Sequence, residues 1–159
     1  MIQLLTFGII IVLFSFASPL QPKAAAQDIG KGEYQLMAAG CIGCHTTKEN
    51  FKKGVLMSGG RALKTPFGIF NSPNITPDPT HGIGRRTEAN FIEVLRSGKS
   101  PEGEHYLPVF PYASFNQMTN EDMRHLWAYM KTVPAIQTQN KTHKAPLIFH
   151  LRFSLGPGR

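Results

Sequence analysis

The sequence predicts a small all-α domain, and three observations support that fold class. Two segments, residues 88–97 and 120–132, carry apolar residues at helical spacing, and each follows a threonine that can cap a helix. A third helix is expected just before residue 41, whereas residues 51–86 show little helical periodicity and much glycine and proline. With 159 residues, 42% of them hydrophobic, the chain is long enough for one globular domain.

The motif Cys41-Ile42-Gly43-Cys44-His45 indicates covalent attachment of haem. Cysteines three positions apart project to one side of a helical turn, where they can bond the two vinyl groups of one porphyrin. His45 then lies under the ring, and its imidazole can take the proximal position on the iron. Since Cys41 and Cys44 are the only cysteines of the chain, none remains for a disulfide or a four-thiolate metal site.

Two other chemistries use paired cysteines, and the sequence favours neither. A thioredoxin-like dithiol would follow a strand within a βαβ unit. A zinc site needs a second pair of Cys or His residues at ligand spacing, and none follows in the sequence. The motif occurs once, without internal repeats, so we predict a single covalently attached haem c.

Residues 1–26 have the layout of an export signal. Leu4–Phe16 is uncharged and apolar, and Ala24–Ala26 offers a small-residue cleavage site before Gln27. The apolar run is shorter than the roughly 20 residues of a membrane span, although an uncleaved anchor stays open. Export to the periplasm fits the cysteines, because c-type haem is attached outside the inner membrane of bacteria. Cleavage would remove one basic residue, Lys23, and lower the net charge from +7 to +6.

The first helix of the mature chain leads into the haem motif. Asp28 is placed to cap this helix. Gly30 and Gly32 weaken it but allow another helix to approach closely. We expect Tyr34 and Met37 in the core.

The long segment over residues 51–86 is expected to be an irregular loop that wraps the edge of the haem and covers its propionates. Propionates favour charge-assisted bonds or bonds from hydroxyl and amide groups. The candidate donors are Arg61, Lys64, Thr65, Asn74 and Thr76.

Two helices with recognisable ends follow this loop. Thr87 caps the helix over residues 88–97, and Gly98 stops it. Thr119 caps the helix over residues 120–132, and Pro134 follows its end.

The last helix is amphipathic. Its apolar residues fall at i, i+3, i+4 and i+7 on one face: Met123, Leu126, Trp127 and Met130. We expect Trp127 and Met130 to pack on the first helix and the haem. His125 points away from this face and is expected in solvent.

Five motifs together carry a resemblance to a known family. In chain order they are GGRALKTPFG, NITPD, GIG, ANFIEVLRSG and FPYASFNQMTNEDMRHLWAYM. Over roughly Ile29 to Ile136 the chain resembles the class I-type c cytochromes that accompany periplasmic or membrane-bound dehydrogenases, including the cytochrome subunits of bacterial alcohol, aldehyde and gluconate dehydrogenases. Those subunits commonly carry three such units, and this chain is similar to a single-haem relative.

The resemblance implies the small cytochrome c fold, in which the N- and C-terminal helices pack around one covalently bound haem and a long irregular loop surrounds its edge. Two departures matter. Arg86 stands where many relatives have Trp before the capping Thr. Phe110-Pro111-Tyr112 stands where many have Met-Pro-Tyr, which puts the sixth ligand in question.

The residues by themselves leave several sixth ligands open. Met57 lies in the loop after the haem motif, Met118 lies just before the last helix, and His105 or water would be the alternative. In relatives with Phe-Pro-Tyr, a Met at the downstream place is a common companion. The resemblance therefore implies Met118 as the axial ligand opposite His45.

By the same resemblance the function is electron transfer without catalysis. The expected donor is a periplasmic or membrane-bound dehydrogenase, and the expected acceptor is a downstream cytochrome or oxidase of the respiratory chain. The basic charge suits an acidic patch on a partner, and nucleic acid is not expected. The alternatives are a peroxidase-like haem enzyme, using His81 or His105, and a gas-binding sensor. Both need an open distal site, so coordination number separates them from a carrier.

The predicted domain covers residues 27–136, and residues 137–159 form a basic tail. The tail contains an apolar segment over residues 146–155 that is too short to span a bilayer. This leaves two uses open: packing on the domain, or docking on a partner or a membrane surface.

Overall fold

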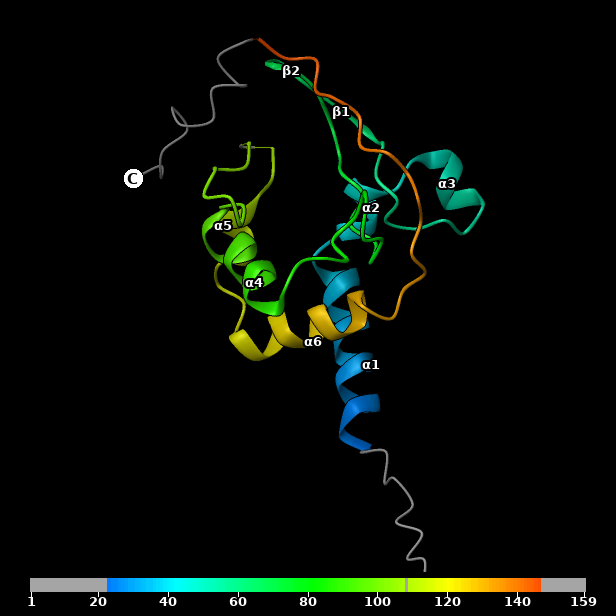
Figure 1. Ribbon diagram of the computed structural model, residues 1–159, viewed down its shortest axis with the longest axis vertical. Coiled ribbons are helices and arrows are strands. Elements are labelled where there is room, and N and C mark those ends of the chain that lie inside the picture. The colour runs from blue at the N-terminus through cyan, green and yellow to red at the C-terminus, as the bar shows by residue number, and fades with distance from the viewer. Residues whose placement is uncertain (1–22, 108, 147–159) are drawn as a thin grey trace, which may run out of the picture.

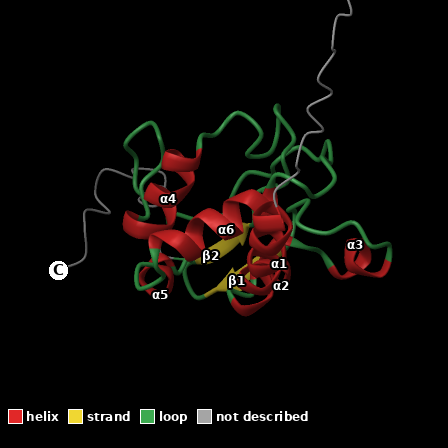
Figure 2. Cartoon of the chain, turned by 90° about the horizontal axis from the view of Figure 1, so that it is seen from below, coloured by secondary structure: helices red, strands yellow, loops and turns green. Residues whose placement is uncertain are grey.

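The computed structural model describes residues 23–107 and 109–146, and this part of the chain is mostly helical (Figures 1 and 2). The elements that it contains are α1 Lys23–Ala38, α2 Cys41–His45, α3 Lys48–Lys52, β1 Ala62–Thr65, β2 Gly68–Asn71, α4 Glu88–Ser97, α5 Tyr112–Phe115 and α6 Asn120–Met130. The predicted helical fold class is confirmed, with one small hairpin added. Within the described ranges, no helix is both long and apolar enough to cross a membrane.

The first and last helices cross at close range, as predicted for this fold (Figures 1 and 2). A Cβ atom on Gly32 would lie 2.0 Å from the backbone oxygen of His125 and 2.6 Å from the Cβ of Tyr129. Beside this contact, Gln35 Nε2 donates to Asp122 Oδ1 at 2.8 Å. Only glycine lets α1 lie this near to the backbone of α6.

Two expectations about the start of α1 are wrong. The helix begins at Lys23, so Asp28 is an internal residue of the helix and does not cap it. The reason is that Ala24–Ala26 have high helix propensity and continue the helix toward the N-terminus. The close approach expected at Gly30 is also absent, because a Cβ there would meet no atom within 4 Å.

The expected burial of three residues is wrong as well. Tyr34 and Met37 are 70% and 64% exposed, and Leu36 is the residue of this turn that enters the core, at 1% exposure. His125, expected in solvent, is 7% exposed, and its Nε2 lies 3.2 Å from Asp28 Oδ1. The cause is the close crossing, since α1 covers the His125 side of α6.

The ends of α4 and α6 follow their capping residues. The Thr87 side chain accepts from the Asn90 amide at 3.1 Å, and Gly98 ends α4 with a φ of 66°. The Thr119 side chain accepts from the Asp122 amide at 3.0 Å. These three predictions are confirmed, although α6 ends at Met130, two residues earlier than expected.

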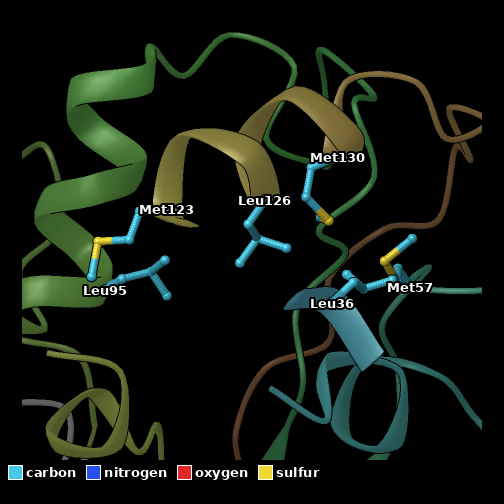
Figure 3. Close-up of a cluster of buried hydrophobic side chains, with 6 residues drawn as sticks. All are labelled: Leu36, Met57, Leu95, Met123, Leu126 and Met130. Atoms are coloured by element: carbon cyan, nitrogen blue, oxygen red, sulfur yellow. The ribbon is translucent and has the colours of Figure 1, made fainter. Parts of the chain in front are cut away.

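The hydrophobic core lies where α1, α4 and α6 meet (Figure 3). Its buried members are Leu36, Met57, Leu95, Met123, Leu126 and Met130. Figure 3 shows Leu36 and Met57 near Met130 at one end of α6, with Leu95 near Met123 at the other. Trp127 packs against Phe91 of α4, with ring centroids 5.2 Å apart.

Two short features were not expected from the sequence: a hairpin within the segment predicted to be irregular, and a short helix at its start. Residues 62–65 and 68–71 pair as an antiparallel hairpin, with Leu63 opposite Phe70. The strands have only four residues each, and Pro66 lies in the connecting turn. The alternation of apolar and polar residues is therefore too short, and too close to glycine and proline, to indicate strands in the sequence. Helix α3 is a single turn capped by Thr47.

Residues 135–146 fold back along the hairpin and the loop that follows it, and we call this segment the C-terminal strap (Figure 1). Ile69 and Lys144 exchange two backbone hydrogen bonds of 2.8 Å. Asn71 donates from its side chain to the Thr142 carbonyl at 2.7 Å. The strap therefore packs on the domain. The rest of the predicted apolar tail segment, and residues 1–22 of the predicted signal, lie outside the described residues.

Candidate haem site

Helix α2 presents the two cysteines one turn apart, directly after the last turn of α1. Both thiols are free; Cys41 is half-buried and Cys44 is exposed. Residues three positions apart on a helix are neighbours on its surface, so both sulfur atoms can reach one planar group. This geometry fits the two thioether bonds of haem c.

The electrostatics of the cysteine pair do not fit a redox dithiol. Burial raises the pKa of the Cys41 thiol to about 11, and the neighbouring Cys44 adds to the rise against an opposing backbone hydrogen bond. Reactive dithiols instead hold one thiol at a lowered pKa, so that a thiolate is present at neutral pH. A zinc site finds no support either, because no group of three or more His, Cys, Asp or Glu residues able to hold a metal occurs among the residues described.

His45 is fixed by a backbone acceptor. Its Nδ1 lies 2.8 Å from the carbonyl oxygen of Pro73, and a carbonyl only accepts, so Nδ1 carries the proton. Burial lowers the pKa of His45, outweighing the opposite effect of the Pro73 carbonyl. The imidazole is therefore neutral with its Nε2 lone pair available, which is the form that binds a metal.

The turn after His45 is tied to residues 57–61. Gly59 donates its amide to the His45 carbonyl at 2.8 Å, and Met57 donates its amide to Thr46 Oγ1 at 2.9 Å. Arg61 reaches back to the carbonyl oxygen of Gly43. Met57, at 2% exposure, is consequently held next to the His45 side of α2.

Met118 lines a cavity of about 400 Å³ between the end of α1 and the α5 region. The lining residues are Gln35, Ala38, Ala39, Pro111, Ser114, Phe115 and Met118. Ala38 and Ala39 come just before the attachment motif, so the cavity that Met118 lines lies close to this motif. Arg96 holds the segment in place, with Nη2 2.6 Å from Asn120 Oδ1.

Most of the predicted propionate donors are engaged with the protein itself. Asn74 and Thr76 are buried, and Thr76 Oγ1 donates to Asn74 Oδ1 at 2.7 Å and accepts from the Ile136 amide at 3.1 Å. Thr65 Oγ1 donates to the Gly68 carbonyl at 3.0 Å, and Arg61 binds the Gly43 carbonyl. Lys64 is exposed. Asn74 and Thr76 therefore serve to anchor the C-terminal strap.

The two histidines that a haem enzyme could use lie in loops away from the attachment motif in sequence, and hydrogen bonds within the protein hold both loops. The His81 amide donates to Asp78 Oδ1 at 2.6 Å, and its carbonyl accepts from Asn140 Nδ2 at 2.8 Å. His105 pairs with Lys99 in an isolated bridge beside the end of α4. Sequence reasoning missed Pro73, Gly59 and Asn140 as parts of the site, because all three act through backbone contacts or long-range packing that leave no local pattern.

A match to the family described as "Cytochrome c" covers residues 31–134. The chain belongs to the cytochrome c family. This confirms the resemblance seen in the sequence, and it confirms an electron carrier rather than an enzyme. A cytochrome c domain implies covalently attached haem c, and the free, adjacent thiols of Cys41 and Cys44 fit it.

The relatives of this cytochrome include subunits of several bacterial dehydrogenases. It is 38% identical to the fructose dehydrogenase cytochrome subunit of Gluconobacter japonicus, over 88% of this chain and 29% of the relative. It is 33% identical to the gluconate 2-dehydrogenase cytochrome c subunit of Pantoea cypripedii, over 93% and 33%. It is 37% identical to a diheme cytochrome c-type protein of Cereibacter sphaeroides, over 96% and 55%. The chain thus spans between about a third and just over half of these proteins.

Proposed function

We propose that this cytochrome is a single-haem electron carrier with His45 and Met118 as axial ligands. It accepts electrons from a periplasmic or membrane-bound dehydrogenase and passes them to the respiratory chain. The observation that carries the proposal is His45 itself. Its ring is neutral, its Nδ1 is bonded to Pro73 at 2.8 Å, and it ends the same helix that presents the two free thiols.

The roles of the residues follow from these contacts. Cys41 and Cys44 hold the haem by thioether bonds, and the haem iron supplies the reversible one-electron change when it is bound. The Pro73 carbonyl orients His45 and raises its basicity, as outer-shell acceptors do at metal sites. Phe115 and Ala38 help to keep the Met118 side of the site apolar, which limits water near the iron.

Met118 is the better of the two methionine candidates. Met57 is buried in the core, and its amide is bonded to Thr46, the residue after His45, so its backbone is held next to His45 itself. Met118 is only partly buried and lines the cavity beside the attachment motif. A flexible thioether in that position can reach an iron from the side opposite His45.

The partner assignment comes from the relatives and from charge. The relatives named above include cytochrome subunits of fructose and gluconate dehydrogenases. The apolar run and small-residue cluster of residues 1–26 suit export to the periplasm, where such a dehydrogenase could donate electrons. The net charge of +6 that remains after cleavage favours encounter with acidic partner surfaces.

Replacement of Met118 tests the ligand assignment. In Met118→Leu we expect loss of the far-red absorption band that marks ferric His/Met haem. The reduction potential should fall on the order of 0.1 V, because a weaker or harder ligand replaces the soft sulfur. Absorption spectroscopy and a spectroelectrochemical titration of the purified protein measure both.

The matched control is Met57→Leu, which replaces a core methionine by a side chain of similar volume without sulfur. This change should cost less than about 1.5 kcal/mol in stability. This variant keeps the far-red band. If the band disappears in Met57→Leu but survives in Met118→Leu, the ligand assignment is wrong.

The partner proposal predicts a salt dependence. Purified catalytic subunits of fructose, alcohol and gluconate dehydrogenases can be screened for reduction of this cytochrome. The second-order rate with the reactive one should fall about tenfold as NaCl rises from low to physiological concentration, since salt screens the attraction between a basic and an acidic surface. Stopped-flow absorbance of the reduced haem gives the rate, and a rate that does not change with salt would exclude electrostatic steering.

A further inference from the structure

The peptide group between Pro73 and Asn74 is bonded on both sides. Its carbonyl oxygen lies 2.8 Å from Nδ1 of His45, and its amide donates to Oδ1 of Asn140 at 2.7 Å. Asn140 belongs to the C-terminal strap, beyond the residues that match the family, which end at 134. A residue of the strap is thus connected to the predicted proximal ligand through a single peptide group.

We propose that Asn140 is a positioning residue that tunes the basicity of His45 through this peptide group. The inference rests on the proposed function in taking His45 as the iron ligand. In an amide the nitrogen lone pair is shared with the carbonyl, so an acceptor on the N–H increases the negative charge on the oxygen. A more negative Pro73 oxygen attracts the Nδ1 proton of His45 more strongly and makes Nε2 a stronger donor.

The orientation of the Asn140 side chain is fixed by two different bonds. Oδ1 accepts from the Asn74 amide, while Nδ2 donates to the His81 carbonyl at 2.8 Å. A reversed side-chain amide would place N–H against N–H and oxygen against oxygen. Only one orientation satisfies both partners, and it is the one that places an acceptor on the Pro73–Asn74 peptide.

The peptide group itself cannot rotate away. A Cβ on Gly59 would lie 2.5 Å from both the Asn74 nitrogen and the Pro73 carbonyl carbon, so the Gly59 backbone packs directly on this peptide. The Asn74 side chain donates to the Ile136 carbonyl at 2.6 Å. Since Gly59 also donates its amide to the His45 carbonyl, the peptide, the histidine and the strap form one bonded unit.

The sign of the effect follows from the direction of polarisation. A more basic axial histidine stabilises the ferric state, so the Asn140 contact lowers the reduction potential. Loss of the acceptor in Asn140→Ala should raise the potential. Outer-shell partners alter metal sites by about 10–100-fold, and Asn140 acts one amide group further out. We therefore expect about a two- to tenfold change in the ratio of oxidised to reduced protein at a fixed applied potential.

The experiment compares three variants of the haem-loaded protein: Asn140→Ala, Asn140→Asp and Gln139→Asp. Asn140→Asp keeps an acceptor for the Asn74 amide and adds a negative charge. Gln139→Asp adds the same charge one residue away, where the side chain is exposed, without the acceptor. We expect the potential to rise in Asn140→Ala and to fall further in Asn140→Asp than in Gln139→Asp. Where Asn140→Ala does not fold, the two Asp variants carry the comparison.

A second readout follows the histidine directly. In the reduced, diamagnetic protein the Nδ1 proton of His45 should move upfield in the NMR spectrum of Asn140→Ala and downfield in that of Asn140→Asp. A merely structural role for Asn140 would not give shifts of opposite sign. The proposal is overturned if the potential and this proton are unchanged in Asn140→Ala, or if both Asp variants shift the potential equally.

The same spectra separate this inference from the proposed function. An iron-bound histidine has ring protons strongly shifted upfield by the porphyrin ring current. If these shifts are present in every variant while the potential does not respond, the Asn140 inference fails and the His45 assignment stands. If the wild-type protein lacks them, the His45 assignment itself is wrong.

Discussion

Replacement of both Cys41 and Cys44 by alanine is expected to yield protein without covalent haem and without a cooperative unfolding transition. The described core has six buried apolar members in its main cluster, three of them methionines. A small domain with so few buried side chains depends on a bound group to stabilise the native state. We expect the loss to exceed the 5–15 kcal/mol that such domains have in total. Circular dichroism during thermal unfolding measures it.

Acid-acetone extraction provides the chemical control for this prediction. Thioether-bound haem stays with the wild-type protein in this solvent, whereas non-covalent haem is extracted. The single variants Cys41→Ala and Cys44→Ala should each retain haem through one bond and unfold at intermediate temperature. Haem that can be extracted from the native protein would contradict the attachment proposed for the motif.

The helices with local signals could be predicted almost to the residue. Thr87, Thr119 and Gly98 are read correctly because capping depends on bonds within four residues of chain, so the sequence around each cap contains the whole interaction. The crossing of the first and last helices was also expected, from the family resemblance together with Gly30 and Gly32, although only Gly32 makes the close approach. The predictions that failed concern which side chains of these helices are buried.

Tyr34, Met37 and His125 show why burial could not be predicted from residue type. Tyr34 and Met37 are apolar or amphipathic, yet α1 turns Leu36 toward α6 and leaves both exposed. His125 is polar, yet the crossing at Gly32 covers it and places Asp28 beside it. Burial on a helix depends on its rotation against its neighbour, and a helix interrupted by glycines, as α1 is, has too weak an apolar stripe to define that rotation.

Some residues of the site could be predicted from a local motif, whereas others depend on long-range contacts. The attachment motif is local, so Cys41, Cys44 and His45 could be proposed from sequence. The acceptor for His45 is a backbone carbonyl 28 residues away, at Pro73, and any residue type could supply a carbonyl. The hairpin and the strap position that carbonyl, and both are held by long-range backbone hydrogen bonds. Strands of four residues have too short a sequence pattern for such pairing to be predicted.

Replacement of Gly32 by alanine is expected to be among the most destabilising single changes at the helix contacts of the domain. The added Cβ would lie 2.0 Å from the His125 carbonyl oxygen and 2.6 Å from the Tyr129 Cβ. Neither is the far end of a flexible side chain, so α6 itself must move away from α1. That movement disturbs the bond from Gln35 to Asp122 and the packing of Leu36. We expect a loss on the order of 3 kcal/mol, at the upper end of the range for overpacked sites.

Gly30→Ala is the matched control, because the same methyl group is added to the same helix two residues earlier. A Cβ there would meet no atom within 4 Å, so only helix propensity changes, and the variant should be more stable by up to about 1 kcal/mol. Guanidinium unfolding followed by circular dichroism at 222 nm gives both free energies. The two alanines should move the midpoint in opposite directions, because the close contact opposes helix propensity at Gly32 alone. Equal midpoints would mean that α1 and α6 do not cross at Gly32.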